Sequence, residues 1–456
     1  MAGASPTACR SARSVRCAIV GGGLLGLTLA LRMQAAGDDV TVYESAPEIG
    51  GLAAPWELGG VTWDRHYHVT LFSDAATRAL LAELGVAEEL EWSTTRTGFF
   101  VGGKLMSLSN ALEFALFPPL GPVDKLRLAA TILRASRSDD TGALAHVPVG
   151  TWLRKWSGRR TYERIWLPLL RAKLGEAHER VAASFIRATV ARLYAARRAG
   201  IDRERFGYVR GGYAVVLRRF SEILARRGVV VRTSTPVRAV LPNGGDGAVR
   251  VTTAEGSFAY DRVIVTAPAP VAARLCSALA APELERLRAV EYQGIVCASL
   301  LLSRPLSPYY VTNVCDPVPF SAVIEMTAVV DPAAFGGRHL VYLPRYCPPD
   351  DPLQTLDDDA IRTHFLAGLR TMHPDLRDDE ILAFRVSRVP YVFPLPTLGY
   401  TARIPAVRTS VDGLFVVNAA QIVDGTLNVN ETVGLANDAA RTILAGPVAR
   451  ALSETA

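Results

Sequence analysis

One stretch of sequence decides the fold, Ala18-Ile19-Val20-Gly21-Gly22-Gly23-Leu24-Leu25-Gly26. An apolar strand leads into a glycine turn, and an Ala/Leu-rich helix follows over residues 27–36 before Gly37 stops it. A second apolar strand over residues 40–43 then ends at the carboxylate of Glu44. Strand, glycine turn, helix, strand and acid in this order form the fingerprint of a dinucleotide-binding fold.

Each glycine of the turn has its own task in such a fold. Gly21 allows the tight turn, Gly23 lets the backbone approach a pyrophosphate, and Gly26 lets the helix lie close to the strand. The helix N-terminus at Leu24 and Leu25 offers backbone N–H groups and a partial positive charge to the phosphates.

The residues after the second strand bear on which dinucleotide binds. Glu44 is placed to accept hydrogen bonds from a ribose and to repel a 2′-phosphate, which leaves both NAD and FAD open. Residues 45–53 favour FAD, because a second glycine pair follows the acid at once. This arrangement resembles the extended FAD signature of the amine oxidase, protoporphyrinogen oxidase and phytoene desaturase superfamily. The resemblance implies contacts to the pyrophosphate and ribityl chain at Ser45, Gly50, Gly51 and Leu52.

Two later parts of the chain resemble the remaining FAD segments of that superfamily. The first covers residues 208–237, and the resemblance implies that the backbone near Val237 contacts the adenine. The second covers residues 413–434, where a helix N-terminus points at the flavin ring in such proteins. Asn418 and Ala419 stand where the superfamily has Gly-Asp, and Asp424 can substitute for that acid. The implied cofactor residues of this part are Asn418, Asp424, Asn430 and Thr432.

The order of the segments predicts an α/β fold with two interleaved domains. We expect a Rossmann-like FAD-binding domain built from discontinuous segments, an interleaved α+β substrate domain and a helical insertion. The expected bounds are 15–105, 201–275 and 405–456 for the FAD-binding segments, 106–200 for the helical insertion and 276–404 for the substrate domain. A hairpin is expected at 99–105 inside the first segment, and a closing helix over 432–444 is expected to pack back on it.

Two histidines follow the paired glycines. The loop over residues 63–68, with Asp74 after it, resembles the histidine-bearing loop of UDP-galactopyranose mutases. In this position the imidazoles of His66 and His68 can place a substrate or move a proton near the flavin. The alternative is a structural loop in which the histidines bond to backbone.

A set of basic and aromatic residues supplies the candidate substrate contacts. Lys173 follows an apolar helical run, and Arg345 follows a strand that ends in Leu-Pro. Together with Tyr342, Tyr391 and Arg403 they would suit an anionic or sugar-linked small molecule. Ordinary packing also accounts for each of these residues singly.

Composition narrows the class of protein. The chain has 456 residues, 49% of them hydrophobic, and a net charge of +6, without the long basic runs that nucleic acid binding favours. Six cysteines show no metal-ligand spacing, so we expect free thiols in a reducing cytoplasm and no metal site. No stretch is apolar enough to span a membrane. Residues 112–133 are apolar, and we expect a buried helical pair there rather than a lid or a membrane contact.

These observations predict a FAD-dependent oxidoreductase that acts on a small molecule, in natural-product or glycan biosynthesis. Hydride would pass from a C–H or C–N bond to the flavin, which explains why no nucleophile triad is visible. The alternative is a redox-neutral flavin mutase or isomerase acting on a nucleotide sugar, which the histidine loop favours. The sequence leaves the substrate, the electron acceptor and the oligomeric state open.

Overall fold

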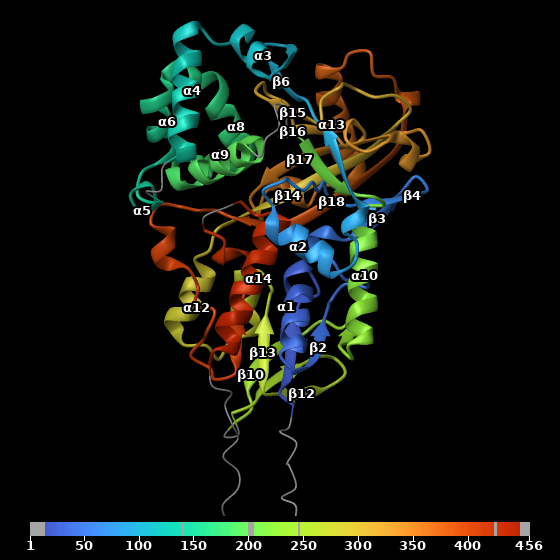
Figure 1. The fold of residues 1–456 in the computed structure, drawn as a ribbon, viewed down its shortest axis with the longest axis vertical. Helices are drawn as coiled ribbons and strands as arrows, with labels where there is room; N and C mark the ends of the chain where they lie inside the picture. The colour runs from blue at the N-terminus through green and yellow to red at the C-terminus, as the bar shows by residue number, and fades with distance from the viewer. Residues whose placement is uncertain (1–13, 138–140, 199–204, 245–246, 424–425, 447–456) are drawn as a thin grey trace, which may run out of the picture.

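The computed structural model describes residues 14–137, 141–198, 205–244, 247–423 and 426–446. The molecule is elongated, with a nucleotide-binding lobe at one end (Figure 1). The other end carries a group of helices beside a large sheet. The candidate site lies where these parts meet.

The nucleotide-binding lobe is built on a parallel sheet whose strands come from distant parts of the chain. The strand order is β19-β13-β1-β2-β9, and every pair is parallel. The strands are β1 (Arg16–Val20), β2 (Asp39–Tyr43), β9 (Val230–Arg232), β13 (Arg262–Val265) and β19 (Leu414–Val416). The doubly wound α/β fold expected from the glycine turn is therefore confirmed, discontinuous segments included.

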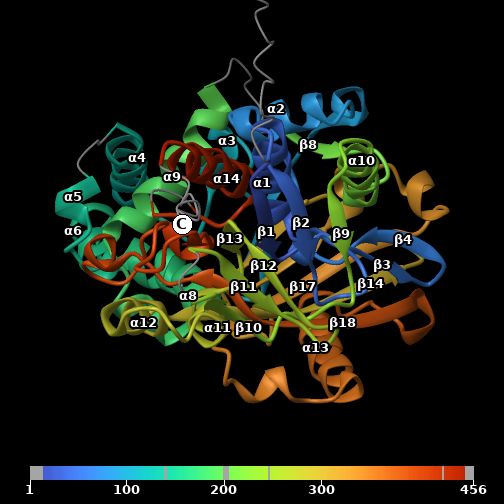
Figure 2. The ribbon, with the colours of Figure 1, turned by 90° about the horizontal axis from the view of Figure 1, so that it is seen from below.

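Alternate side chains of these strands enter two separate cores. One face packs Ile19 and Val42 against helices α1 (Leu24–Ala35), α10 (Tyr213–Arg226) and α14 (Val429–Leu444). The other face packs against a smaller sheet and two helices, on the opposite side of the parallel sheet in Figure 2. These elements are β10 (Ala239–Pro242), β11 (Val249–Thr252), β12 (Ser257–Tyr260), α11 (Ala269–Leu275) and α12 (Ala281–Arg288).

The closing helix α14 returns to the first helix, as expected. Arg32 on α1 donates from Nε to Oδ1 of Asn437 on α14, at 2.8 Å. The apolar faces of both helices share one core with Leu80 and Leu81 of α2 (Ala75–Glu83). The last segment of the chain is thereby fixed against the first, and both contribute to one domain.

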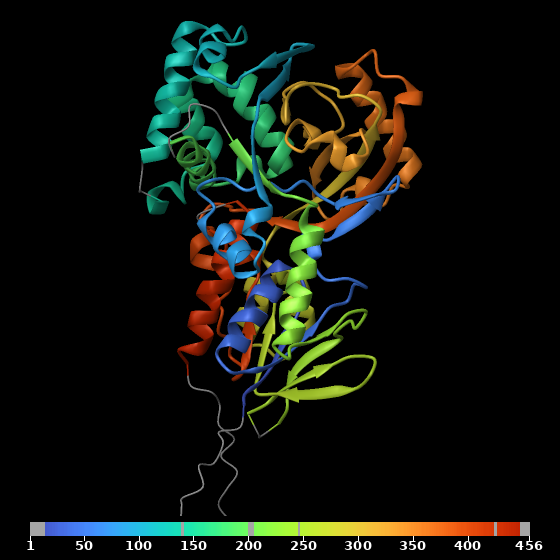
Figure 3. The same cartoon turned by 45° about the vertical axis from the view of Figure 1, so that its right-hand side comes forward.

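The second lobe is organised by a seven-stranded sheet in the order β18-β14-β17-β16-β15-β6-β7. Its strands are β6 (Thr97–Val101), β7 (Lys104–Ser107), β14 (Tyr292–Leu302), β15 (Val311–Val314), β16 (Ala322–Glu325), β17 (His339–Cys347) and β18 (Ile381–Pro394). Helix α13 (Asp358–Met372) packs on one face through Phe365 and Leu369. The other face looks toward the nucleotide-binding lobe (Figure 3).

The hairpin expected at 99–105 forms, but it belongs to this second sheet. β6 pairs in parallel with β15, and β7 lies at the sheet edge. Backbone pairing with a strand more than 200 residues away placed the hairpin there, and local turn chemistry carries no information about that partner. The expected domain bounds stay predictions.

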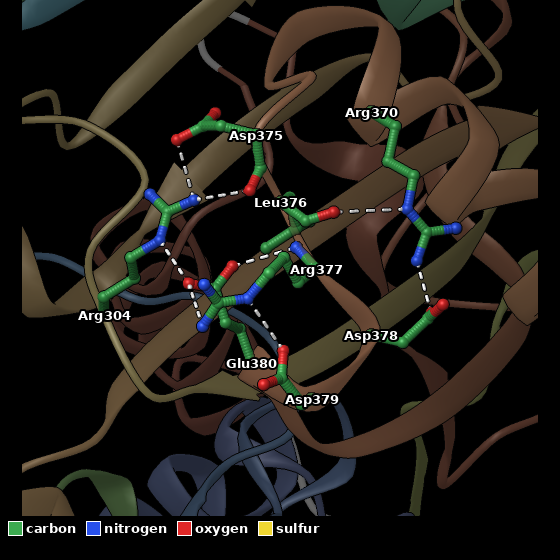
Figure 4. A network of polar contacts seen from close by, with 8 residues as sticks. All are labelled: Arg304, Arg370, Asp375, Leu376, Arg377, Asp378, Asp379 and Glu380. Carbon is green, nitrogen blue, oxygen red and sulfur yellow. Dashed lines mark hydrogen bonds and ion pairs between the residues drawn. The ribbon is translucent and has the colours of Figure 1, made fainter.

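An ionic network in the second lobe includes Arg304, Asp375 and Glu380 (Figure 4). Arg304 donates from Nε to Glu380 at 2.7 Å and from Nη2 to Asp375 at 2.8 Å. Glu380 is 6% exposed and also accepts the backbone N–H of Arg377. The network joins the segment after β14 to the connection between α13 and β18, so its role is structural.

The helical insertion packs on one side of this sheet and holds most of the remaining helices. These are α3 (Ala111–Leu116), α4 (Pro122–Arg137), α5 (Thr141–Leu144), α6 (Val149–Ser157), α7 (Arg159–Thr161), α8 (Leu167–Leu174) and α9 (Ala183–Arg198). A π-helical turn over Tyr162–Trp166 precedes α8. Two small sheets, β3 (Pro55–Leu58) with β4 (Val61–Asp64) and β5 (Leu90–Thr94) with β8 (Arg205–Val209), link the lobes.

The expectation of a buried helical pair over residues 112–133 is wrong. Leu112 and Leu116 on α3 are each 69% exposed, and Leu126 on α4 is 73% exposed. Phe114, Phe117 and Leu128 supply the inward contacts instead. Apolar composition predicted burial, yet only part of these residues can face the core because each helix is covered on one side.

No helix among the described residues is long and apolar enough to cross a membrane. In the same residues no group of three His, Cys, Asp or Glu side chains is placed to hold a metal ion. Five cysteines are described, and all of them are free thiols.

Candidate cofactor and substrate sites

Two positions of the glycine turn after β1, Gly21 and Gly26, are packed too closely for a larger residue. A Cβ on Gly26 would overlap the carbonyl oxygen of Gly21, and Gly21 itself has a φ of +119°. Gly23 is the N-cap residue of α1 and has no side chain, so no side chain covers the N–H groups of Leu24 and Leu25. The start of α1 therefore presents bare backbone donors, as an anion site requires.

The second glycine pair lies directly against the first. The N–H of Gly50 donates to the carbonyl of Gly22 at 2.8 Å, and Gly23 and Gly50 form an isolated parallel bridge. A Cβ on Gly51 would lie 3.2 Å from the Cα of Gly23. The two segments, 27 residues apart, thus form one cradle made of backbone. Its shape fits a pyrophosphate, because side chains there would fill the space.

Glu44 lies beside this cradle at the end of β2. Its Oε2 accepts the N–H of Gly22 at 2.7 Å, and its Oε1 accepts the N–H of Ala46 at 2.8 Å and the hydroxyl of Ser45 at 3.2 Å. These three contacts fix the carboxylate at the mouth of the glycine turn. The ribose contact of Glu44 and the roles of Ser45 and Leu52 stay predictions.

The later cofactor candidates are more strongly engaged with the protein itself. Asn430 accepts the N–H groups of Ala76 and Thr77 at 2.9 and 3.3 Å, which caps helix α2. Thr432 donates to the carbonyl of Asn428 at 2.8 Å inside α14. The helix cap of α14 is Asn428, which accepts the N–H of Glu431, and we did not predict it. The Asn-x-x-Glu spacing of a capping box could have revealed it.

Three further cofactor candidates are Asn418, Val237 and Asp424. Asn418 is 1% exposed, and its side-chain Oδ1 accepts the N–H of Ala420 at 3.0 Å, which holds a turn after β19. Val237 is half-buried between β9 and β10. Asp424 lies outside the described residues.

Both ring nitrogens of His66 have hydrogen-bond partners, one on the cofactor loop and one on the substrate sheet. Its Nδ1 lies 3.1 Å from the carbonyl oxygen of Leu52, and its Nε2 lies 3.2 Å from the hydroxyl of Ser387 on β18. Because a carbonyl only accepts, Nδ1 carries the proton and Nε2 accepts from Ser387. Burial lowers the pKa of His66 to about 4, so the ring is neutral near pH 7. Ser387, 321 residues away, left no signal in the sequence.

His68 faces different neighbours. Its Nδ1 lies 3.7 Å from Oδ2 of Asp64, and its ring lies 4.9 Å from that of Tyr213 at the start of α10. Asp64 is buried and accepts the N–H of Tyr213 at 2.7 Å. His68 also lines a small pocket with Tyr208. The two histidines thus do not converge on one point, and their catalytic roles stay predictions.

Lys173 on α8 lies among aromatic rings. Its Nζ is 3.6 Å from the ring centre of Tyr346 and 5.3 Å from that of Phe393. The hydroxyl of Tyr346 bonds that of Tyr67 at 2.9 Å. No acidic partner of Lys173 is found among the described residues, so a half-buried cation is left next to the face of the sheet that looks toward the cofactor loop.

The structure separates Tyr342 from Arg345. Alternate residues of β17 point to opposite faces of the sheet. Tyr342 enters the core toward the nucleotide-binding lobe and donates to the carbonyl of Asp64 at 2.6 Å. Arg345 is in register with Val296, whose side chain lies in the core under α13. Tyr342 and Arg345 therefore face opposite sides of the sheet, and the contact of either residue with a substrate stays a prediction.

Tyr391 and Arg403 lie near the junction of the two lobes. The ring of Tyr391 is 5.6 Å from that of Tyr292, whose hydroxyl accepts the N–H of Ala269 at the start of α11. Arg403 donates to Thr397 and to the carbonyl of Leu398, both at 3.0 Å. Both residues have structural partners, and their contact with a substrate stays a prediction.

Comparison with known proteins identifies the class. The model of the flavin-containing amine oxidoreductase family matches residues 26–444, so the chain belongs to that family. Its cofactor is FAD, and the glycine cradle and α1 N-terminus are the parts that fit the dinucleotide.

Individual relatives agree with this class. Coproporphyrinogen III oxidase of Mycobacterium tuberculosis is 30% identical over 282 residues, 58% of this chain and 61% of that protein. The chain thus matches less than two thirds of the length of such relatives. A putative protoporphyrinogen oxidase from Exiguobacterium sp. 255-15 has the same fold, with a TM-score of 0.75, 21% identity and coverage of 95% and 99% of the two chains. A reduced UDP-galactopyranose mutase shares the fold at a TM-score of 0.71, with 14% identity and coverage of 94% of both.

Proposed function

We propose that this protein oxidises an anionic small molecule, taking a hydride from a C–H or C–N bond. The bound FAD would supply the hydride acceptor. One observation carries the proposal: the backbone-only cradle of Gly22-Gly23 and Gly50-Gly51 in a member of the flavin-containing amine oxidoreductase family.

The substrate site of this proposal is the cluster of Lys173, Tyr346, Tyr67 and Phe393. An ammonium group over two rings, with no carboxylate partner among the described residues, is a ready partner for a carboxylate or phosphate. The aromatic rings offer flat apolar surface for the rest of the molecule. An anionic compound with an apolar body fits this combination.

The tyrosine pair serves to position the substrate rather than to remove a proton. Burial raises the pKa of Tyr67 far above its usual value, so its phenol stays protonated. The hydrogen bond between Tyr67 and Tyr346 fixes the ring against which Lys173 rests. The lysine ammonium is then held at one place before the substrate arrives, which lowers the entropic cost of binding.

A biosynthetic role in the cytoplasm is part of the same proposal. The five described cysteines are free, which fits a reducing compartment. A relative with the name coproporphyrinogen III oxidase supports a small molecule as the substrate class.

Anaerobic stopped-flow absorbance tests the proposal on the purified FAD-bound protein. A panel of amines and porphyrinogens, each with and without a carboxylate, is mixed with the oxidised protein, and sugar nucleotides are added to the panel as further anionic members. Bleaching of the flavin by an anionic member, and not by its neutral partner, is the expected result. Turnover of a sugar nucleotide only after dithionite reduction would instead support the mutase alternative. Protein that neither carries nor takes up FAD would overturn both.

A further inference from the structure

Helix α8 ends against the substrate sheet, and its last turn carries Lys173. The last four carbonyls of an α-helix have no partner inside the helix. In α8 the carbonyl of Arg171 accepts the N–H of Gly175, a common arrangement at a helix end. The carbonyls of Ala172 and Leu174 accept from side chains that belong to distant parts of the chain. The two neighbours of Lys173 are therefore both held from outside the helix.

Ser321 holds the residue before Lys173. Its hydroxyl donates to the carbonyl of Ala172 at 2.6 Å and accepts the N–H of Tyr346 at 3.4 Å. Its own N–H donates to the carbonyl of Pro344 at 2.7 Å, so the serine is itself fixed to β17. Ser321 is 8% exposed, and burial strengthens these hydrogen bonds by keeping water away. One hydroxyl thus joins the helix that carries Lys173 to the strand that carries Tyr346.

Gln293 on β14 holds the residue after Lys173. Its Nε2 donates to the carbonyl of Leu174 at 2.6 Å, and the residue is 1% exposed. Its Oε1 is buried and has no partner among the described residues. A Cβ on Gly175, whose φ is +56°, would lie 3.1 Å from Nε2 of Gln293. Gln293 is also in register with Phe393, whose ring lies 5.3 Å from the Lys173 ammonium.

The contacts of Ser321 close a ring around the Lys173 side chain. The ring runs from Ser321 through Ala172 to Lys173, whose ammonium lies 3.6 Å from the ring centre of Tyr346. It returns from the N–H of Tyr346 to the serine hydroxyl. A lysine side chain normally has large conformational freedom, which is lost when it binds a ligand. Here the backbone at its base and the aromatic ring at its head limit that freedom before a ligand arrives.

We propose that Ser321 and Gln293 are positioning residues for Lys173, which keep its ammonium at the ring of Tyr346 and so make the site selective for an anionic group. Both side chains bind the backbone of α8, so they act through the lysine. The inference rests on the proposed function, because it concerns the cation of that substrate site. Loss of either hydrogen bond should weaken the binding of an anion and leave the binding of a matched neutral molecule unchanged.

Calorimetric titration of the FAD-bound protein with benzoate tests the proposal without turnover. Benzoate carries a carboxylate on an apolar ring, and benzamide is its neutral match. Wild type should bind benzoate more tightly than benzamide. Ser321→Ala and Gln293→Met should each raise the benzoate dissociation constant roughly fivefold, the contribution of about one hydrogen bond, with no change for benzamide.

Two controls separate positioning from packing. Ser93→Ala removes a hydroxyl that donates to the carbonyl of Val329 at 2.7 Å, on a strand of another sheet, and benzoate binding should stay at the wild-type level. In a Lys173→Met background, Ser321→Ala should cause no further loss, because the group that it positions is gone. Flavin absorbance and thermal unfolding show that each variant is folded.

The outcomes distinguish this inference from the proposed function. Wild-type benzoate affinity in Ser321→Ala and Gln293→Met, with weaker binding in Lys173→Met, overturns the inference alone. Equal weakening for benzoate and benzamide overturns it too, as does an additive loss in the double variant. Benzoate binding that Lys173→Met leaves unchanged would overturn the substrate site together with the inference. Bleaching of the flavin in the stopped-flow experiment would still support the oxidation itself.

Discussion

Two buried ionisable groups give the stability of this protein an opposed pH dependence. His66 is 8% exposed, and burial lowers its pKa to about 4. Glu325 is 1% exposed, and burial raises its pKa to about 7 although the N–H groups of Leu306 and Ser307 donate to it. One group therefore resists protonation in the native state, and the other resists deprotonation.

The sign and size follow from linkage. The native state binds fewer protons at His66 than the unfolded state, so stability is full above pH 6.5 and is lost as the pH falls toward about 4. At Glu325 the native state binds more protons, so stability is full below pH 4.5 and is lost as the pH rises toward about 7. Each shift corresponds to about 3 kcal/mol. In the wild type the two trends oppose each other across most of this range.

Removing one group should therefore reveal the other. We expect the stability of His66→Gln to fall as the pH rises from 4.5 to 7, and that of Glu325→Gln to fall as the pH drops over the same range. Differential scanning calorimetry with saturating FAD measures this as a difference from wild type at each pH. His364→Gln and Glu48→Gln, at exposed positions, are the matched controls. Difference curves that are flat, or that slope the same way for both variants, would refute the reasoning.

Three further predictions concern the cofactor and substrate sites. Gly26→Ala should abolish FAD uptake, because the added Cβ would overlap the carbonyl oxygen of Gly21. Gly142→Ala is the control, since its Cβ would meet open space on α5 and FAD uptake should stay unchanged. Flavin absorbance after purification measures FAD uptake in both variants. Glu44→Ala should raise the FAD dissociation constant roughly tenfold in a fluorescence titration, and an unchanged constant would contradict the predicted ribose contact of its carboxylate. Lys173→Met should raise KM for an anionic substrate at least about tenfold with little change in kcat, while Arg171→Met, exposed on the same helix, should not.

The sequence predicted the parts of this protein that depend on local backbone geometry. The spacing of Gly21, Gly23 and Gly26 sets a turn that few other structures need, so strand, turn and helix followed from it. The contacts of the substrate region are of another kind. Tyr67 meets Tyr346 across 279 residues, and only the folded sheet brings them together.

Side-chain direction is what the sequence left out in two places. Tyr342 and Arg345 were placed in one set of basic and aromatic candidates, and their odd spacing along β17 points them to opposite faces of the sheet. The leucines of α3 and α4 were expected to be buried because they are apolar, but apolar residues occupied both sides of α3 and only one side met the core. In each case the residue types were identified correctly and their direction was not.

His66 joins the two sites into one unit, and a pair of serines can test this. Ser387 donates to Nε2 of His66. Ser299 is on the neighbouring strand β14, two residues from Cys297, which is the register partner of Ser387, so both serines face the same side of the sheet. The hydroxyl of Ser299 is buried and has no partner among the described residues. Ser387→Ala leaves the imidazole nitrogen buried and unpaired, at a cost of roughly 1–3 kcal/mol. Ser299→Ala removes a group that is already unpaired, so it should be neutral or stabilising.

The same pair separates positioning from packing. Nδ1 of His66 donates to the carbonyl of Leu52, which is next to Gly51 in the glycine cradle. Ser387→Ala removes the hydrogen bond that holds the imidazole from the other side, so the Leu52 loop should be held less firmly. The FAD dissociation constant of Ser387→Ala should therefore rise. Ser299→Ala should keep the wild-type constant, which fluorescence titration and thermal unfolding together would show. If both variants lost stability and FAD affinity equally, the serines would matter only as packing, and His66 would not connect the cofactor loop to the substrate sheet.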